Sequence, residues 1–292
     1  MRHIACHVSR SVLTLSLALW CVWSTACART LVRPVVSAPV PATEALLVLP
    51  GFGDSRAGAD AMRAVAPALA ADGIELFIPR FLDRGGLADS RERLQRFIRE
   101  QPFERYQRVH VFAFIAGGWA INPLLEAGAL PNLSTIVYDR SPMQERAPRV
   151  AVETLPLFAW IRYGSPVFDV ARTRYPPLTR SAVRVGLLVE TKPTGFVKRH
   201  AATVRGYGPL QFECDALGQR YDDCAYLPFS HDEMYRRFAD VWREVRPFVT
   251  SGRFNDHAMR QPPDADPLQR QTAVAGQGLQ TLPHRDPASW RR

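Results

Sequence analysis

Short apolar runs alternate with amphipathic segments between residues 44 and 250, and this alternation limits the folds open to the chain. The apolar runs have the length of buried strands: Ala45–Leu49, Glu75–Phe81, Arg108–Ile115, Ser134–Asp139 and Ala182–Val189. Helical spacing is found in residues 58–71, Ser90–Glu100, Gly117–Ala127 and, last, Asp232–Val249. Parallel strands need long crossover connections, and helices provide them. The pattern therefore predicts an α/β fold with a doubly wound, mostly parallel sheet.

The size and charge of the chain limit the number of domains and the kinds of partner that we expect. Its 292 residues, 47% of them hydrophobic, suit one large α/β domain with terminal extensions. The formal net charge of +9 indicates some affinity for anions. The basic residues are scattered among acidic and apolar ones, however, and form no stripe interleaved with aromatic residues. We therefore expect no nucleic-acid partner.

Residues 1–28 have the pattern of a secretory signal peptide. Basic residues precede the apolar run Ser11–Trp23, and small residues follow it. The run is shorter than the ~20 residues that span a bilayer. Cleavage after Ala28 would release a soluble periplasmic or secreted protein. Cleavage before Cys27, in a sequence that partly resembles a lipoprotein box, would leave a lipid-anchored one. Both alternatives stay open, and a lipid anchor is the one membrane attachment that we expect.

Three segments stand outside the alternation. Residues 29–43 are rich in proline and predict an extended linker. Residues 251–292 hold five prolines and little apolar content, which predicts a disordered tail. Residues 141–180 are rich in aromatic residues and predict a cap over a cleft, although an ordinary packing excursion remains an alternative.

Two cysteines remain in the part expected to fold. Cys214 and Cys224 have nine residues between them, and in an oxidising compartment we expect a disulfide. Two thiols without a histidine at ligand spacing make a poor zinc site. The chain also lacks the H-E-x-x-H pattern and a complete phosphate-binding loop. We therefore predict no metal and no cofactor.

The segment from Ala113 to Gly117 resembles the strand–elbow–helix of the α/β-hydrolase superfamily, which includes lipases and esterases. In that family, small residues stand two positions on either side of the nucleophile because the sharp turn leaves no room for larger ones. Ala113 and Gly117 fill both positions. The centre is Ile115, where the family has Ser, Cys or Asp. The resemblance implies an α/β-hydrolase-type sheet with a cap insertion, apparently without the catalytic nucleophile.

The loop after the first strand also resembles part of that family. Residues 49–55 stand where the family has the loop that donates an N–H group to the oxyanion hole. The resemblance assigns oxyanion or ligand-binding positions to Gly51, Phe52 and Gly53, and to Ala116 after the elbow.

The remaining catalytic positions can be matched by order along the chain. His231 precedes the last helix, where the family usually has its catalytic histidine. For the acidic member, Glu190 follows the fifth strand and Asp139 ends the fourth. The sequence does not decide between the two carboxylates.

An isoleucine has no lone pair with which to attack a carbonyl, so Ile115 cannot act as a nucleophile. We therefore predict an exported, catalytically degenerate protein that binds an apolar or ester-like small molecule or acts as an accessory protein. The rival is an active esterase or lipase-like serine hydrolase whose displaced nucleophile is Ser55 or Ser141. A third alternative is an interaction protein with a closed cleft. The oligomeric state is not predicted.

Overall fold

The computed structural model describes residues 42–52, 56–139, 146–208, 210, 212–262 and 268. The predicted signal peptide, Cys27 and nearly all of the predicted linker lie outside the described residues. Within the described ranges, no helix has both the length and the apolar character needed to cross a bilayer.

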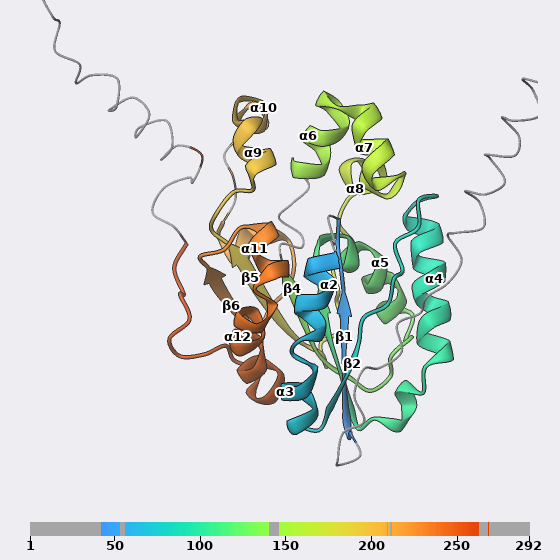
Figure 1. Cartoon of the computed structure of the whole chain (residues 1–292). Helices are drawn as coiled ribbons and strands as arrows, with labels where there is room; N and C mark the ends of the chain where they lie inside the picture. Colours follow the sequence, from blue (N-terminus) through green and yellow to red (C-terminus); the bar gives the residue numbers. More distant parts are fainter. Residues whose placement is uncertain are drawn as a thin grey trace, which may run out of the picture. The chain divides into compact units, whose positions relative to one another are not determined.

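Six parallel strands form one sheet in the order β2-β1-β3-β4-β5-β6 (Figure 1). They are β1 (Glu44–Leu49), β2 (Ile74–Phe77), β3 (Arg108–Ala113), β4 (Leu133–Asp139), β5 (Arg184–Glu190) and β6 (Asp223–Leu227). The chain runs from β1 outward to β2 and then crosses back to place β3 on the other side of β1. The winding direction therefore reverses between β1 and β3. In open parallel sheets, ligands usually bind at the carboxyl ends of the two strands that flank such a reversal.

Helices cover both faces of the sheet (Figure 1). The helices are α2 (Arg56–Arg63), α3 (Ala66–Ala71), α4 (Leu87–Glu100), α5 (Ile115–Glu126), α6 (Arg146–Thr154), α7 (Pro156–Tyr163), α8 (Pro166–Arg172), α9 (Gly195–Arg199), α10 (Ala201–Gly206), α11 (His231–Arg236) and α12 (Phe238–Ser251), with short 3-10 helices η1 (Phe103–Arg105) and η3 (Cys214–Leu217). Helices α4 and α5 pack on one face, and α2, α3, α11 and α12 pack on the other. Successive residues of a strand point to opposite faces, so Val111 joins the first core and Phe112 the second. The predicted doubly wound parallel sheet is confirmed.

Several boundaries differ from the sequence-based prediction. The helix expected over residues 58–71 is two helices, because Pro67 lies in the first turn of α3 and has no N–H to continue α2. The last helix is likewise divided, at Arg237, into α11 and α12. Strand β6 was not predicted, because its five residues begin with a charged side chain and give only a short apolar run.

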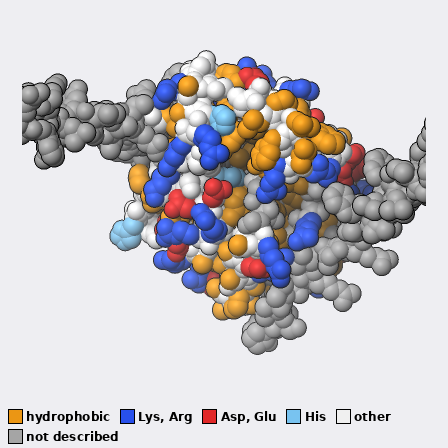
Figure 2. All heavy atoms as spheres, turned by 45° about the horizontal axis from the view of Figure 1, so that its top comes forward, with side chains coloured by type: hydrophobic (Ala, Val, Ile, Leu, Met, Phe, Trp, Pro, Cys, Tyr) orange, Lys and Arg blue, Asp and Glu red, His pale blue; other side chains and the backbone are white. Residues whose placement is uncertain are grey.

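Two insertions build the end of the molecule above the carboxyl ends of the strands (Figure 1). Helices α6 to α8 lie between β4 and β5, and α9 and α10 lie between β5 and β6. Val150 of α6 shares a buried cluster with Val197 of α9 and Val204 of α10. The sequence indicated a cap only in the first insertion. We call α6 to α10 together the cap; Figure 2 looks onto this end, where hydrophobic side chains gather over part of it and Lys and Arg side chains lie around them.

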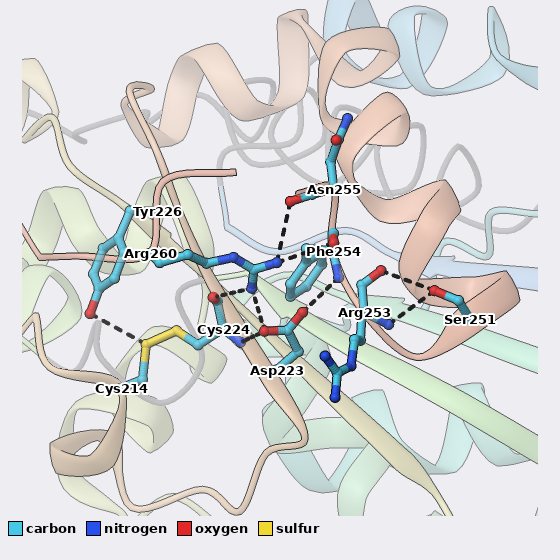
Figure 3. Close-up of polar contacts among 9 residues, drawn as sticks. All are labelled: Cys214, Asp223, Cys224, Tyr226, Ser251, Arg253, Phe254, Asn255 and Arg260. Carbon is cyan, nitrogen blue, oxygen red and sulfur yellow. Dashed lines mark hydrogen bonds and ion pairs between the residues drawn. A yellow bond between two sulfur atoms is a disulfide. The ribbon is translucent and has the colours of Figure 1, made fainter. Parts of the chain in front are cut away.

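Residues 252–260 cover the outer edge of β6, which is the edge strand of the sheet (Figure 3). The Tyr226 N–H donates to the Met259 carbonyl at 2.8 Å, and the Phe254 N–H donates to the Asp223 carboxylate at 2.6 Å. The Arg260 guanidinium donates to the Asp223 carboxylate and to a neighbouring carbonyl. The first residues of the predicted tail are therefore held on the sheet. Residues 263–267 and 269–292 lie outside the described part of the chain.

Cys214 of η3 and Cys224 of β6 form the predicted disulfide, with their Cα atoms 6.6 Å apart (Figure 3). The Tyr226 hydroxyl lies 3.4 Å from the Cys214 sulfur and donates to the Phe212 carbonyl at 2.9 Å. The disulfide and this hydrogen bond tie the connection that leads into β6 to the strand itself.

Candidate functional site

Strand register brings the two candidate carboxylates to the same face of the sheet. Asp139, the last residue of β4, is paired with Leu188 of β5, and Glu190 stands two residues beyond Leu188. Because side chains alternate along a strand, Asp139 and Glu190 point to the same face, the one that α11 covers. Both carboxylates are buried.

His231 opens α11 directly above these carboxylates. Ser230 is the N-cap, and its N–H donates to the Glu233 carboxylate at 2.8 Å in a capping box. This hydrogen bond lowers the pKa of Glu233. The cap fixes the start of the helix, so it also fixes the position of His231. The side chain of His231 is 10% exposed.

The imidazole is hydrogen-bonded to one of the two carboxylates. His231 Nδ1 lies 3.1 Å from Glu190 Oε1 and 3.9 Å from Asp139 Oδ2. The shorter of the two distances is a hydrogen bond between His231 and Glu190, and the Asp139 carboxylate is a second acidic neighbour of the ring. When the Glu190 carboxylate is ionised it can only accept, and the hydrogen bond then places the proton on Nδ1 and the lone pair of the ring on Nε2. This is the tautomer in which a histidine acts as a general base.

The same three side chains form a donor set for a cation. Asp139, Glu190 and His231 each offer a ligand atom, and these atoms lie within 4.8 Å of one another. Two carboxylates and an imidazole suit several divalent ions. Among the described residues, this is the one group of His, Cys, Asp and Glu with that geometry.

Ile115 begins α5 at the carboxyl end of β3, the position that the sequence comparison assigned to it. Its side chain is 4% exposed and packs with Leu87, Trp119, Val170 and Tyr175. Val170 belongs to α8, so Ile115 is part of an apolar contact between the sheet and the cap. At this position the chain presents packing surface and no group that can attack a carbonyl.

Steric crowding explains the glycine two positions after Ile115. A Cβ built on Gly117 would lie 2.8 Å from both Cβ and O of Leu49 in β1. Helix α5 therefore approaches β1 so closely that only glycine fits. The close approach that the elbow pattern implied is present.

The loop after β1 is held by a residue that sequence reasoning missed. The Gly51 N–H donates to the Tyr235 hydroxyl at 2.8 Å, and the Tyr235 ring stacks on Phe114 at 4.2 Å between centroids. Tyr235 stands four residues after His231 and so lies on the same side of α11. The spacing of four residues from His231 is the one sequence signal that could have indicated a role for Tyr235. The Gly51 amide is thus engaged within the protein.

The remaining candidate residues come from the loop, from the elbow and from the displaced-nucleophile positions. Phe52 is half-buried and contacts the cluster around Ile115. Ala116 is buried in the first turn of α5, where helix N–H groups have no partner within the helix. Gly53, Ser55 and Ser141 lie outside the described residues.

A pocket of about 690 Å³ flanks the loop after β1. Its walls come from Pro50 to Phe52, from α2, from residues 79–82 and from the end of α7. Of the residues that the structure describes, four arginines, Arg56, Arg63, Arg80 and Arg162, line it together with one acid, Asp60, which pairs with Arg63. Phe52, Phe81 and Tyr163 add aromatic surface. The pocket therefore combines apolar walls with a positive potential, and the cluster around His231 is not part of its lining.

Comparison with known proteins supports the fold. No family model matches the sequence, and no curated protein matches it. The propeptide form of the lipase BlEst2 from Bacillus licheniformis superposes with a TM-score of 0.52 at 14% identity, over 79% of this chain and 54% of that one. The type II thioesterase BorB of the borrelidin biosynthetic cluster superposes with a TM-score of 0.50 at 12% identity, over 75% and 95%. Such low identities establish the fold alone, and the fold is that of the α/β-hydrolases.

Proposed function

We propose that this protein, which has the α/β-hydrolase fold, is an exported and catalytically degenerate binding or accessory protein that takes up an apolar or ester-like small molecule. The observation that carries the proposal is the environment of Ile115. A buried aliphatic side chain occupies the nucleophile position and packs against the cap. Because catalytic triads act as a unit, the loss of the nucleophile removes acyl-enzyme chemistry even where the histidine and its acid remain.

The pocket beside the loop supports the ligand class. Aromatic walls suit an acyl chain or another apolar group, and the arginines suit the oxygens of a carboxylate or an ester. Phe52 contributes both to the pocket and to the cluster around Ile115. A ligand in this pocket would therefore lie beside the degenerate elbow.

Export is supported by two independent features. The apolar run Ser11–Trp23, preceded by Arg2 and Arg10 and followed by small residues, has the pattern of a signal peptide. The disulfide between Cys214 and Cys224 suits an oxidising compartment. We propose a periplasmic or secreted location, and the mass of the mature N-terminus distinguishes cleavage after Ala28 from lipidation of Cys27.

A second candidate function is that of an active esterase-like hydrolase with a displaced nucleophile. The hydrogen bond between His231 and Glu190 favours it, because a histidine with its proton held on Nδ1 is ready to serve as a base. Ser55 and Ser141 are the candidate nucleophiles.

Active-site labelling separates the two candidates. Wild-type protein is treated with a fluorophosphonate probe and assayed with short-chain nitrophenyl esters. We expect no labelling, and no turnover above that of the His231→Ala variant. Stoichiometric labelling of one serine, lost in Ser55→Ala or in Ser141→Ala, would instead establish the hydrolase.

A gain-of-function variant tests why the wild type would be inactive. Ile115→Ser restores a hydroxyl at the elbow and is expected to acquire labelling, while Ile115→Ser combined with His231→Ala is not. Circular dichroism must show that both variants remain folded. A folded Ile115→Ser variant that never labels would mean that more than the nucleophile has been lost.

A further inference from the structure

Helix α7 of the cap exposes an unusual amount of apolar surface. Five large hydrophobic side chains in and beside it are between 40% and 70% exposed: Leu155, Leu157, Phe158, Trp160 and Ile161. Elsewhere in the described chain, Met259 is the one other large hydrophobic residue with comparable exposure. A contiguous apolar group of this size on a protein surface usually marks an interaction site. We call these five residues the α7 patch.

The α7 patch is held on a fixed support. Ala159 is the buried residue of α7 and packs with Ala151 and Val167 of the neighbouring cap helices. The Arg84 guanidinium donates to the carbonyls of Trp160 and Ile161, each at 3.0 Å. These contacts anchor the inner side and the carboxyl end of α7, so the patch side chains are directed outward by the fold.

The surroundings of the patch are positively charged. The Arg84 guanidinium lies 5.7 Å from the Trp160 ring centre, and the exposed Arg162 and Arg172 follow in α7 and α8. No Asp or Glu occurs from residue 155 to residue 168. The acids on either side along the chain are engaged: Glu153 pairs with Arg149, and Asp169 accepts from the Leu87 N–H. Asp83 and Asp89 lie beside Gly85, next to Arg84, and Asp83 pairs with Arg93. Figure 2 shows the hydrophobic side chains of this end with basic side chains at their margin.

We propose that the α7 patch is a docking surface for an anionic lipid membrane. Leucine, phenylalanine, isoleucine and tryptophan side chains enter the boundary between headgroups and acyl chains, while flanking arginines bind acidic headgroups. The formal net charge of +9 supports attraction to such a surface. This contact is additional to any lipid anchor at Cys27 and does not depend on the proposed function.

The patch adjoins the pocket described above. Ile161 belongs to the patch, and the next two residues, Arg162 and Tyr163, line the pocket. Docking through α7 would therefore bring the pocket close to the lipid surface, where apolar and ester-like molecules are concentrated.

Vesicle binding by the full chain tests the proposal. Phosphatidylcholine vesicles with and without phosphatidylglycerol are sedimented with wild-type protein and with the triple variant Leu157→Ser, Phe158→Ser, Ile161→Ser. We expect wild type to prefer the anionic vesicles and the triple variant to bind them at least ~10-fold more weakly. The control is Met259→Ser, which removes an exposed hydrophobic side chain from the segment along β6 and should bind as wild type does. All chains carry residues 11–23, so the difference between variants reports on α7 alone.

Two further readouts assign the contact. Brominated lipids should quench fluorescence in wild type more than in Trp160→Phe, and Arg162→Gln with Arg172→Gln should weaken binding to anionic vesicles only. Equal binding by wild type and the triple variant, or equal wild-type binding to neutral and anionic vesicles, would overturn the proposal. A dimer that the triple variant abolishes, without vesicle binding, would assign the patch to a second copy of the chain instead.

Discussion

His231 Nδ1 lies 3.1 Å from Glu190 Oε1, although the two residues are separated by 41 positions and belong to different elements. The end of β5 supplies the carboxylate, and the capping box at Ser230 fixes the start of the helix that carries the imidazole. Asp139 Oδ2 lies 3.9 Å from the same nitrogen, beyond hydrogen-bonding distance. The end of β5 and the start of α11 thus bring an acid and a histidine together in the buried part of the molecule.

The first prediction concerns which carboxylate supports His231. In the Ile115→Ser background, Glu190→Gln should reduce fluorophosphonate labelling by ~10²–10⁴-fold, because an amide no longer holds the proton on Nδ1. Asp139→Asn is the matched control and should reduce labelling by less than ~10-fold. Labelling rates at equal protein concentration provide the measurement. The reverse order would make Asp139 the functional acid.

The second prediction tests the close approach of α5 to β1. Gly117→Ala places a Cβ 2.8 Å from backbone and side-chain atoms of Leu49 and should lower the free energy of unfolding by about 1–3 kcal/mol. Gly195→Ala is the control, because nothing lies within 4 Å of its added Cβ. Its free energy of unfolding should stay within about 0.5 kcal/mol of wild type or rise slightly. Urea unfolding of both variants decides; equal losses would refute the steric account.

Much of this architecture can be predicted from the sequence, because the patterns that indicate it involve residues close together in the chain. Alternation of strand and helix patterns predicts the parallel sheet, and the small residues Ala113 and Gly117 locate the elbow because a steric demand acts on neighbouring positions. The contact between Gly51 and Tyr235 joins residues 184 positions apart and leaves no such local pattern. Helices α9 and α10 were missed for a related reason, since their apolar residues pack on α6 and form no long periodic stretch.

The candidate site likewise has a part that the sequence predicted and a part that it did not. Matching the order of positions in the α/β-hydrolase resemblance singled out Asp139, Glu190 and His231; in the structure the first two end β4 and β5, and His231 follows β6. The choice of Glu190 as the hydrogen-bond partner depends on register between β4 and β5 and on the capping of α11. The register and the helix cap set the distances between elements, and a single sequence contains no pattern from which such distances can be predicted.

The third prediction concerns the disulfide. Replacing Cys214 and Cys224 by serine removes a cross-link around a loop of about ten residues and should cost about 2–3 kcal/mol of unfolding free energy. Reductant should destabilise the wild type to the same extent and leave the double variant unchanged. Urea unfolding with and without reductant provides both comparisons. A wild type indifferent to reductant would show that the bond contributes nothing to stability.

The fourth prediction concerns the pocket. Arg80 lines it and takes part in no ion pair among the described residues. Arg80→Gln should therefore weaken binding of a medium-chain carboxylate such as decanoate by ~10-fold, because a charge-assisted hydrogen bond is lost. Arg99→Gln, on the far part of α4, is the control and should bind as wild type does. Isothermal titration measures both affinities, and equal weakening in the two variants would indicate a general charge effect instead of a site.

The fifth prediction follows from a buried histidine in the sheet. His110 of β3 is fully buried, with Nδ1 2.8 Å from Thr135 Oγ1 and Nε2 2.7 Å from Glu44 Oε2. Burial lowers the pKa of His110, although the Glu44 carboxylate opposes the shift. As pH falls below about 6.5, the unfolded chain takes up a proton at this residue that the folded chain does not. Stability must therefore decrease with falling pH in that range, by up to ~1.4 kcal/mol per pH unit.

The pH dependence of unfolding in His110→Gln checks this. Between pH 7.5 and pH 5.5, the free energy of unfolding of wild type should fall more steeply than that of the variant, because glutamine does not titrate. His257→Gln, at an exposed position, should retain the wild-type slope. A variant slope as steep as that of the wild type would mean that other groups, and not His110, set the pH dependence of stability.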